Sequence, residues 1–147
     1  MGSDFEITVV AKTQKQADRQ IGKAIDEISR VEALISSWKP TSQTSSINEN
    51  AGIAPVKISG ELFSLIQRAL QISKLTDGAF DISYASMDRL WKYDGSMTQM
   101  PSKEAIKKSV AKVGYKSIVL DPKNSTVFLK NKGMKIGFGA IGKGYAA

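Results

Sequence analysis

The 147-residue sequence contains no cysteine and no histidine. It therefore has no disulfide, no thiol or imidazole catalyst, no Ser-His-Asp triad and none of the usual zinc or iron–sulfur ligands. A metal ion would have to be bound by oxygen atoms, which favours Mg²⁺ or Ca²⁺. The apolar runs, such as the one at residues 118–120, are also too short to cross a bilayer.

The residues that are present are typical of a single globular domain. Hydrophobic residues make up 41% of the chain and charged residues 24%, with 12 Gly and 4 Pro, so a disordered or fibrous chain is excluded. Lys and Arg number 21 against 14 Asp and Glu, which gives a formal net charge of +7. This charge suits an anionic partner, but it does not choose among a phosphate ester, a nucleic acid and a membrane surface.

The spacing of apolar residues predicts the elements of the N-terminal half. Alternation over residues 4–12 predicts a strand with one buried face. Apolar residues every three or four positions then predict a long amphipathic helix, capped by Thr13 and ending near Trp38. The polar residues 41–50 are predicted to be a loop, and residues 59–78 contain a second helix that begins with a serine cap.

The C-terminal half is predicted to begin with a third helix and to end in strands. Residues 101–114 carry the helix, and residues 79–91 have no assignment. Residues 117–121 and 126–130 read as a hairpin, and a further strand is predicted over residues 134–138. This order indicates an α+β fold in one domain, without an internal repeat or linker. The third helix is expected to bury Ile106, Val110 and Val113.

Residues 137–144 are the most glycine-dense part of the sequence. Residues 137–142 fit G-x-G-x-x-G, and extension through Lys143 fits the first seven positions of the phosphate loop. Neither motif is complete, because Gly144 replaces the magnesium-binding hydroxyl and no downstream acid of a dinucleotide fold follows. Two interpretations stay open: a backbone cradle for phosphate, or a turn whose glycines permit close packing.

Several short segments, taken together in their order along the chain, match one known family. The most specific are residues 76–81 (Thr-Asp-Gly-Ala-Phe-Asp) and residues 140–146 (Ala-Ile-Gly-Lys-Gly-Tyr-Ala), and residues 1–3, 37–39 and 45–48 add weaker matches. In these segments the chain resembles the FAD:protein FMN transferases, the ApbE family. The resemblance implies an α+β, T-fold-like flavin transferase domain, of which residues 1–147 form the N-terminal portion.

The resemblance also implies an activity and its partners. Members of the family bind FAD and Mg²⁺, cleave the pyrophosphate and pass FMN to a Thr or Ser hydroxyl of an acceptor protein, releasing AMP. Some members hydrolyse FAD instead. The acceptor would be a flavoprotein subunit of a membrane redox complex, since relatives usually act as lipoproteins on the periplasmic side of the cytoplasmic membrane.

The family's site residues can be carried over one by one. A tryptophan at position 38 offers a flat face for ring stacking, Asp81 can accept hydrogen bonds and Lys143 would neutralise pyrophosphate charge. No residue is assigned as the catalytic base. The resemblance places flavin-nucleotide contacts on Met1, Trp38, Ala79, Phe80, Asp81 and Lys143, and a metal ligand on the backbone carbonyl of Ala140.

Two departures from the family pattern bear on the metal. Gly137 stands three positions before the metal-binding carbonyl, where many relatives have an acidic residue. The family's metal-binding Asp and Thr lie in its C-terminal half, and we expect the native protein to continue beyond Ala147. We therefore expect the 147-residue chain not to turn over by itself.

Plainer interpretations stand beside this one. Trp38 closes an apolar helical face, where core packing is the simplest explanation, and the lysines of the third helix favour a solvated face. No aromatic residues interleave those lysines, so we expect no nucleic-acid partner. The functional alternatives are an FAD pyrophosphatase, a flavin-binding module without catalysis and, less favoured, a basic nucleic-acid-binding domain. Whether the chain folds alone or as a homo-oligomer stays open.

Overall fold

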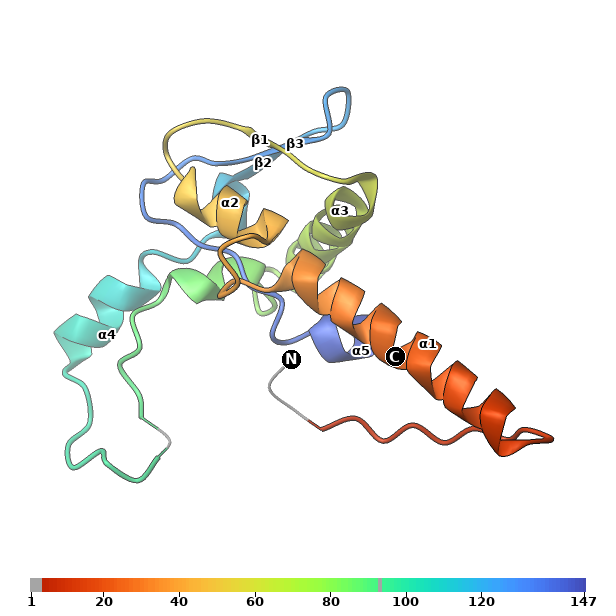
Figure 1. The fold of residues 1–147 in the computed structure, drawn as a ribbon. Helices are drawn as coiled ribbons and strands as arrows, with labels where there is room; N and C mark the ends of the chain where they lie inside the picture. The colour runs from red at the N-terminus through yellow and green to blue at the C-terminus, as the bar shows by residue number, and fades with distance from the viewer. Residues whose placement is uncertain (1–3, 93) are drawn as a thin grey trace.

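The computed structural model describes residues 4–92 and 94–147 and confirms an α+β fold, with a small sheet packed against helices (Figure 1). None of the helices in these residues is long and apolar enough to span a bilayer. The helices are α1 (Gln14–Ile35), α2 (Gln43–Glu49), α3 (Gly60–Leu75), α4 (Lys103–Val110) and α5 (Gly142–Ala146), with the 3₁₀ helices η1 (Ile82–Ser86) and η2 (Tyr115–Ser117). The strands are β1 (Val56–Lys57), β2 (Ile118–Asp121) and β3 (Thr126–Leu129).

Helix α1 begins as predicted and ends three residues early. The Thr13 hydroxyl accepts a hydrogen bond from the Gln16 amide at 3.3 Å, which is the expected N-cap. At the other end Ser36 is extended, and its hydroxyl accepts from the Lys39 amide at 3.2 Å, so the chain turns before Trp38. Only the last turns are buried, through Val31, Leu34 and Ile35, and the rest of α1 projects from the body (Figure 1).

The strand predicted over residues 4–12 is wrong. The segment is extended and runs back beneath α1, but it pairs with no strand among the described residues (Figure 1). Its alternating side chains instead face the helix, where Phe5 and Ile7 line a shallow groove with Ile21, Ile25 and Ile28 of α1. Ile7 and Val9 are partly covered, but Phe5 is 38% exposed and none of residues 4–12 is buried, so the predicted buried face is also wrong. A strand would further require a neighbouring backbone.

The loop predicted over residues 41–50 is also wrong, because α2 forms there. The Ser42 hydroxyl caps it by accepting from the Ser45 amide at 2.9 Å, and Ile47 is 1% exposed. Ser42 also donates its hydroxyl hydrogen to the Ser36 carbonyl, and Thr44 donates to the Leu34 carbonyl at 3.2 Å. Buried hydroxyls that are satisfied by backbone carbonyls let a polar sequence pack inside, which composition alone does not predict.

The sheet is antiparallel with the order β1-β3-β2. The predicted hairpin is confirmed, with Ile118 opposite Leu129 and Asp121 opposite Thr126. Its third strand is the two-residue β1, in which Val56 lies opposite Val127, rather than the strand predicted over residues 134–138.

Residues 134–138 have the buried alternation of a strand, but their backbone pairs with no strand within residues 4–92 and 94–147. Met134, Ile136 and Phe138 are at most 3% exposed. Side chains replace the neighbouring strand: Asn48 exchanges two hydrogen bonds with the backbone of Ile136, at 2.8 and 3.0 Å, and the Ser86 hydroxyl bonds both backbone groups of Lys135. The segment is therefore held at a fixed depth in the core by α2 and η1.

The third predicted helix is confirmed as α4, capped by Ser102, whose hydroxyl accepts from the Ala105 amide at 3.1 Å. Its lysines are exposed, as expected for a solvated face. The helix ends at Val110, four residues before the predicted end at Gly114. The expected burial is also wrong, because Val110 is 50% exposed and Ile106 and Val113 are only half-buried. Val110 lies beside a hollow that is described below.

We expect Gly52→Ala to lower the free energy of unfolding by about 2 kcal/mol, as measured by urea denaturation. Gly52 has φ +74°, and an added Cβ would lie 2.7 Å from both the amide nitrogen and the Cα of Lys132. Neither atom can move without shifting the backbone. Gly22→Ala is the matched control, because nothing lies within 4 Å of its added Cβ and alanine favours the helix. Equal stability of the two variants would contradict this reading.

Candidate functional site

Residues 76–81, the most specific segment of the resemblance, form the connection from α3 to η1. Asp77 and Gly78 both have positive φ, 49° and 83°, and the Gly78 amide donates to the Ser73 carbonyl at 2.8 Å. The Asp77 amide donates to Lys74 at 3.3 Å, which completes a Schellman-type helix end. The Thr76 hydroxyl accepts from the Phe80 amide at 3.1 Å. These hydrogen bonds fix the turn between α3 and η1, and so the position of residues 79–81.

The carboxylate of Asp81 is bound by donors from its own chain. It caps η1, because Oδ1 accepts from the Ser83 amide at 2.8 Å and from the Ser83 hydroxyl at 2.7 Å. Oδ2 accepts from the Tyr115 amide at 2.8 Å, and the Ser83 hydroxyl accepts from the Gly114 amide at 2.8 Å. Asp81 therefore joins η1 to η2, a structural role that its place in a motif does not reveal.

The glycine-rich segment packs closely under η1. A Cβ on Gly137 would lie 3.1 Å from the Cβ of Ala85, and one on Gly139 would lie 2.7 Å from the hydroxyl oxygen of Tyr84. The Phe138 carbonyl then accepts from the amides of Ile141 and Gly142, at 3.0 and 2.7 Å, and the chain turns into α5. Close packing accordingly accounts for the first two glycines, as one of the two interpretations expected.

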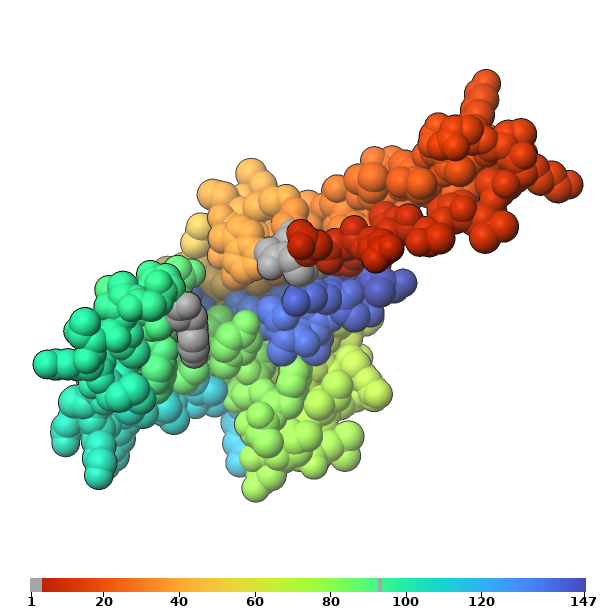
Figure 2. Space-filling model, turned by 90° about the horizontal axis from the view of Figure 1, so that it is seen from below, coloured from red at the N-terminus to blue at the C-terminus, as the bar shows by residue number. Residues whose placement is uncertain are grey.

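Two hollows flank this segment, which reaches the surface between α1 and the residues that follow α3 (Figure 2). The smaller hollow lies where α1 ends and α5 begins. The larger has a volume of about 380 Å³, within the range of ligand pockets, which is about 300–1,000 Å³. The residues that line the smaller hollow are Glu32, Ile35, Ser36, Trp38, Phe138, Gly139, Gly142 and Lys143. The residues that line the larger hollow are Gly78, Ala79, Phe80, Asp81, Ile82, Tyr84, Met87, Val110, Val113, Gly137, Ala140 and Ile141.

The structure brings the predicted residues together in two groups. Trp38 and Lys143 line the smaller hollow, and residues 79–81 line the larger one with Ala140. The core interpretation of Trp38 is wrong, because its side chain is 65% exposed. Met1 lies outside the described residues, so its predicted contact stays a prediction.

Sequence reasoning missed most of the larger hollow's apolar lining. Tyr84 and Met87 fall in the stretch without an assignment, and Val110 and Val113 were expected in the core. No sequence signal indicated these residues, because the exposure of Val110 depends on how α4 packs.

Of the lysines at and beside the smaller hollow, Lys39 is ion-paired and Lys143 is available to bind an anion. Glu32 is ion-paired with Lys39, whose ammonium nitrogen lies 2.8 Å from the carboxylate and lowers the pKa of Glu32 below its usual value. Lys143 is exposed, and its side-chain ammonium makes no hydrogen bond or ion pair within residues 4–92 and 94–147. Its ammonium is therefore available to an anionic ligand.

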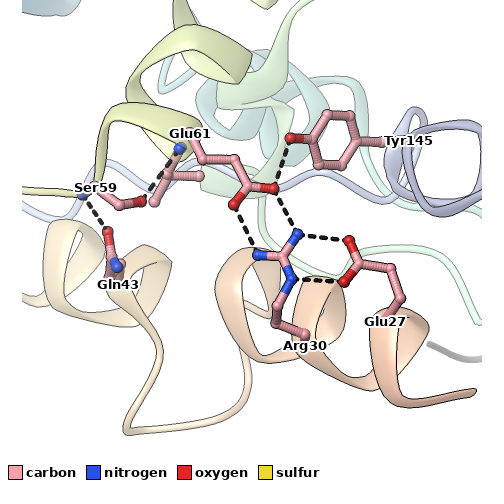
Figure 3. Close-up of polar contacts among 7 residues, drawn as sticks. Glu27, Arg30, Gln43, Ser59, Glu61 and Tyr145 are labelled. Atoms are coloured by element: carbon pink, nitrogen blue, oxygen red, sulfur yellow. Dashed lines mark hydrogen bonds and ion pairs between the residues drawn. The ribbon is translucent and has the colours of Figure 1, made fainter. Parts of the chain in front are cut away.

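Beside this hollow, polar side chains join three helices (Figure 3). Arg30 of α1 contacts Glu27 through two hydrogen bonds and Glu61 of α3 through two more, all between 2.7 and 2.9 Å. The Tyr145 hydroxyl of α5 donates to Glu61 at 2.9 Å. Hydrogen bonding from Arg30 lowers the pKa of Glu61, and burial together with Glu61 raises the pKa of Tyr145. At neutral pH the pair is therefore a neutral phenol donating to a carboxylate.

The described residues do not amount to a complete Mg²⁺ site. No three acidic side chains come together as a metal-binding group in residues 4–92 and 94–147. The Ala140 carbonyl accepts no hydrogen bond there and is open, but Asp81 in the same hollow is already bound by three donors. Mg²⁺ requires a near-octahedral set of about six ligands, of which this part of the chain offers one.

Solved structures share this fold. The ApbE protein from Thermotoga maritima has a TM-score of 0.76 and 33% identity over 92% of this chain and 44% of its own. The flavinyl transferase ApbE of Pseudomonas stutzeri, in its apo form, has a TM-score of 0.73 and 22% identity over 93% of this chain and 42% of its own. The architecture is thus that of ApbE flavin transferases, as the resemblance implied.

The chain belongs to the ApbE family, whose family model matches residues 1–147. It is 31% identical to an FAD:protein FMN transferase of Klebsiella pneumoniae (strain 342), over 100% of this chain and 45% of the relative. It is 27% identical to the FAD:protein FMN transferase of Treponema pallidum (strain Nichols), over 90% of this chain and 39% of the relative. The chain spans less than half the length of these relatives.

Proposed function

We propose that this chain supplies the N-terminal portion of an FAD:protein FMN transferase and carries much of its flavin-nucleotide site. One observation supports this most directly. Residues matched to the family from three separate parts of the sequence, around positions 38, 80 and 143, line two adjacent hollows on either side of one glycine-rich segment. The reaction is inferred from the names of the relatives, and the two hollows are the proposed binding site for FAD.

The proposed reaction needs positioning and charge stabilisation more than it needs a nucleophilic side chain. A Thr or Ser hydroxyl oxygen of the acceptor attacks the FMN phosphorus of FAD. The pyrophosphate bond breaks, AMP leaves with the bridging oxygen, and the hydroxyl proton is released. Lys143 would offset phosphate charge at the smaller hollow, and Trp38 would stack on a ring.

The proposal includes Mg²⁺, for which this chain would supply one ligand. When bound, Mg²⁺ stabilises negative charge on phosphoryl oxygens. The open carbonyl of Ala140 would be one ligand, and the others would come from the portion of the domain that the relatives have and this chain does not span.

The acceptor and the site of action follow from the resemblance. We propose a flavoprotein subunit of a membrane redox complex as acceptor, with the enzyme a lipoprotein on the periplasmic side. An FAD pyrophosphatase would use water in place of the acceptor hydroxyl. Because we expect no turnover by residues 1–147 alone, the test uses a protein that also carries the portion that the relatives have and this chain does not span. Incubation of that protein with FAD and Mg²⁺, with and without acceptor, separates the two activities, since transfer releases AMP only with acceptor present.

We expect Lys143→Ala to weaken FAD binding by about tenfold or more, because it removes a charge-assisted contact to phosphate. Native mass spectrometry first tests for an FAD adduct on the wild-type chain, and a fluorescence titration then gives the dissociation constants. Lys123→Ala is the control, because it removes an exposed lysine in the turn between β2 and β3. No adduct, or equal affinities of the two variants, would contradict the proposed site.

A further inference from the structure

We propose that Arg30, Glu61 and Tyr145 form a positioning network that holds α5 so that Lys143 faces the smaller hollow. The inference rests on the proposed function, because it assigns these residues to the placement of a flavin-nucleotide contact. None of the three lines either hollow beside the glycine-rich segment. They would act through Lys143 rather than touch the ligand.

The first turn of helix α5 has little stability of its own. Two of its residues, Gly142 and Gly144, are glycine, which lowers helix propensity. No side chain among residues 4–92 and 94–147 caps its N-terminus. Tertiary contacts therefore set the position of this turn.

The network supplies such a contact from two directions (Figure 3). Tyr145 donates its hydroxyl hydrogen to Oε1 of Glu61 at 2.9 Å, which ties α5 to α3. Both oxygens of that carboxylate also accept from the guanidinium of Arg30, at 2.7 and 2.9 Å, which ties the pair to α1. A bidentate guanidinium fixes the plane of the carboxylate, and so the direction in which it receives the phenol.

Helix geometry connects this anchor to Lys143. Residues two apart on an α-helix point roughly 200° apart, which is nearly opposite. Because Tyr145 is held against Glu61, Lys143 is turned away from α3. It lines the hollow that also contains Trp38, at the end of the helix to which Arg30 belongs. Loss of the Tyr145 hydroxyl would let α5 rotate, so that the Lys143 ammonium no longer keeps one position at the smaller hollow.

A double-mutant cycle with FAD as ligand tests the network. We expect Tyr145→Phe to weaken FAD binding about three- to tenfold, the worth of one hydrogen bond. In a Lys143→Ala background the same change should have almost no effect, because the group that it positions is gone. An equal loss in both backgrounds would overturn the proposal. Asp88→Asn is the control, since it removes an exposed carboxylate that is paired to Lys112 at 2.6 Å.

A ligand-free measurement separates this proposal from the proposed function. In a Trp91→Phe background Trp38 is the only tryptophan, and iodide quenching relative to acrylamide reports nearby positive charge. Lys143→Ala and Tyr145→Phe should both lower this ratio, and Asp88→Asn should leave it unchanged. If Lys143→Ala alone lowers it, the positioning network is wrong whether or not FAD binds. If both lower it without FAD binding, the network stands and the proposed function fails.

Discussion

Replacement of Asp81 by alanine should remove about 3 kcal/mol of folding free energy, because three donors lose their acceptor at once. Two of these donors belong to Ser83, which is fully buried, and the third is the Tyr115 amide. The amide and hydroxyl of the buried Ser83 would lose the acceptor that satisfies them, which carries a desolvation cost. Urea denaturation should show the loss, and the melting temperature should fall by about 10 °C.

This result would change how a binding defect at Asp81 is understood. Asp81→Asn keeps one acceptor oxygen and should lose roughly half as much stability, because its amide group opposes one of the donors. If Asp81→Ala kept its stability and lost only FAD affinity, the carboxylate would serve the ligand instead, and the structural assignment would be wrong.

Replacement of Asn48 by alanine should cost about 3 kcal/mol, a comparable loss from a residue outside both hollows. Its side chain is the only partner of the Ile136 amide and carbonyl within residues 4–92 and 94–147, and Ile136 is fully buried. Because residues 137–143 follow directly, we also expect the glycine-rich segment to lose its fixed position. Amide hydrogen exchange over residues 135–143 measures this effect.

Asn50→Ala provides the comparison for Asn48. Asn50 is the C-cap of α2, and its side chain donates at 2.9 Å to the Ser46 carbonyl of that helix, so its loss should cost less than about 1 kcal/mol. A similar small loss for Asn48→Ala would show that residues 134–138 are held by side-chain packing and by the Ser86 hydrogen bonds, without need of Asn48.

Elements with a local cause were predictable from the sequence. The caps at Thr13, Ser59 and Ser102 each bind an amide three residues ahead, so the helix starts follow from neighbouring residues. The hairpin likewise follows from its turn residues. The errors at residues 4–12 and 134–138 share a different cause, since apolar alternation cannot tell whether a second backbone is present.

For the candidate site, the motifs located the residues better than their roles. Residues 79–81 and 143 do lie beside hollows, as the resemblance implied, although on opposite sides of the glycine-rich segment. The bonds that occupy Asp81 come from residues 83 and 115, and no local pattern indicates the second of these. Tyr84 was missed because its importance depends on close approach to Gly139, which is 55 positions away in the chain.

The two ends of helix α1 differ in stability, because its last turns are buried and its first turns are not. Its buried residues begin at Val31, and the turns before Arg30 lie outside the core. Local fraying of those first turns exposes few buried contacts, so it occurs without global unfolding. Glu61 still holds Arg30 at the boundary, because the two side chains meet across α1 and α3. The first turns of α1, with the extended residues 4–12 that pack on them, can therefore fray while the hydrogen bonds between Arg30 and Glu61 stay in place.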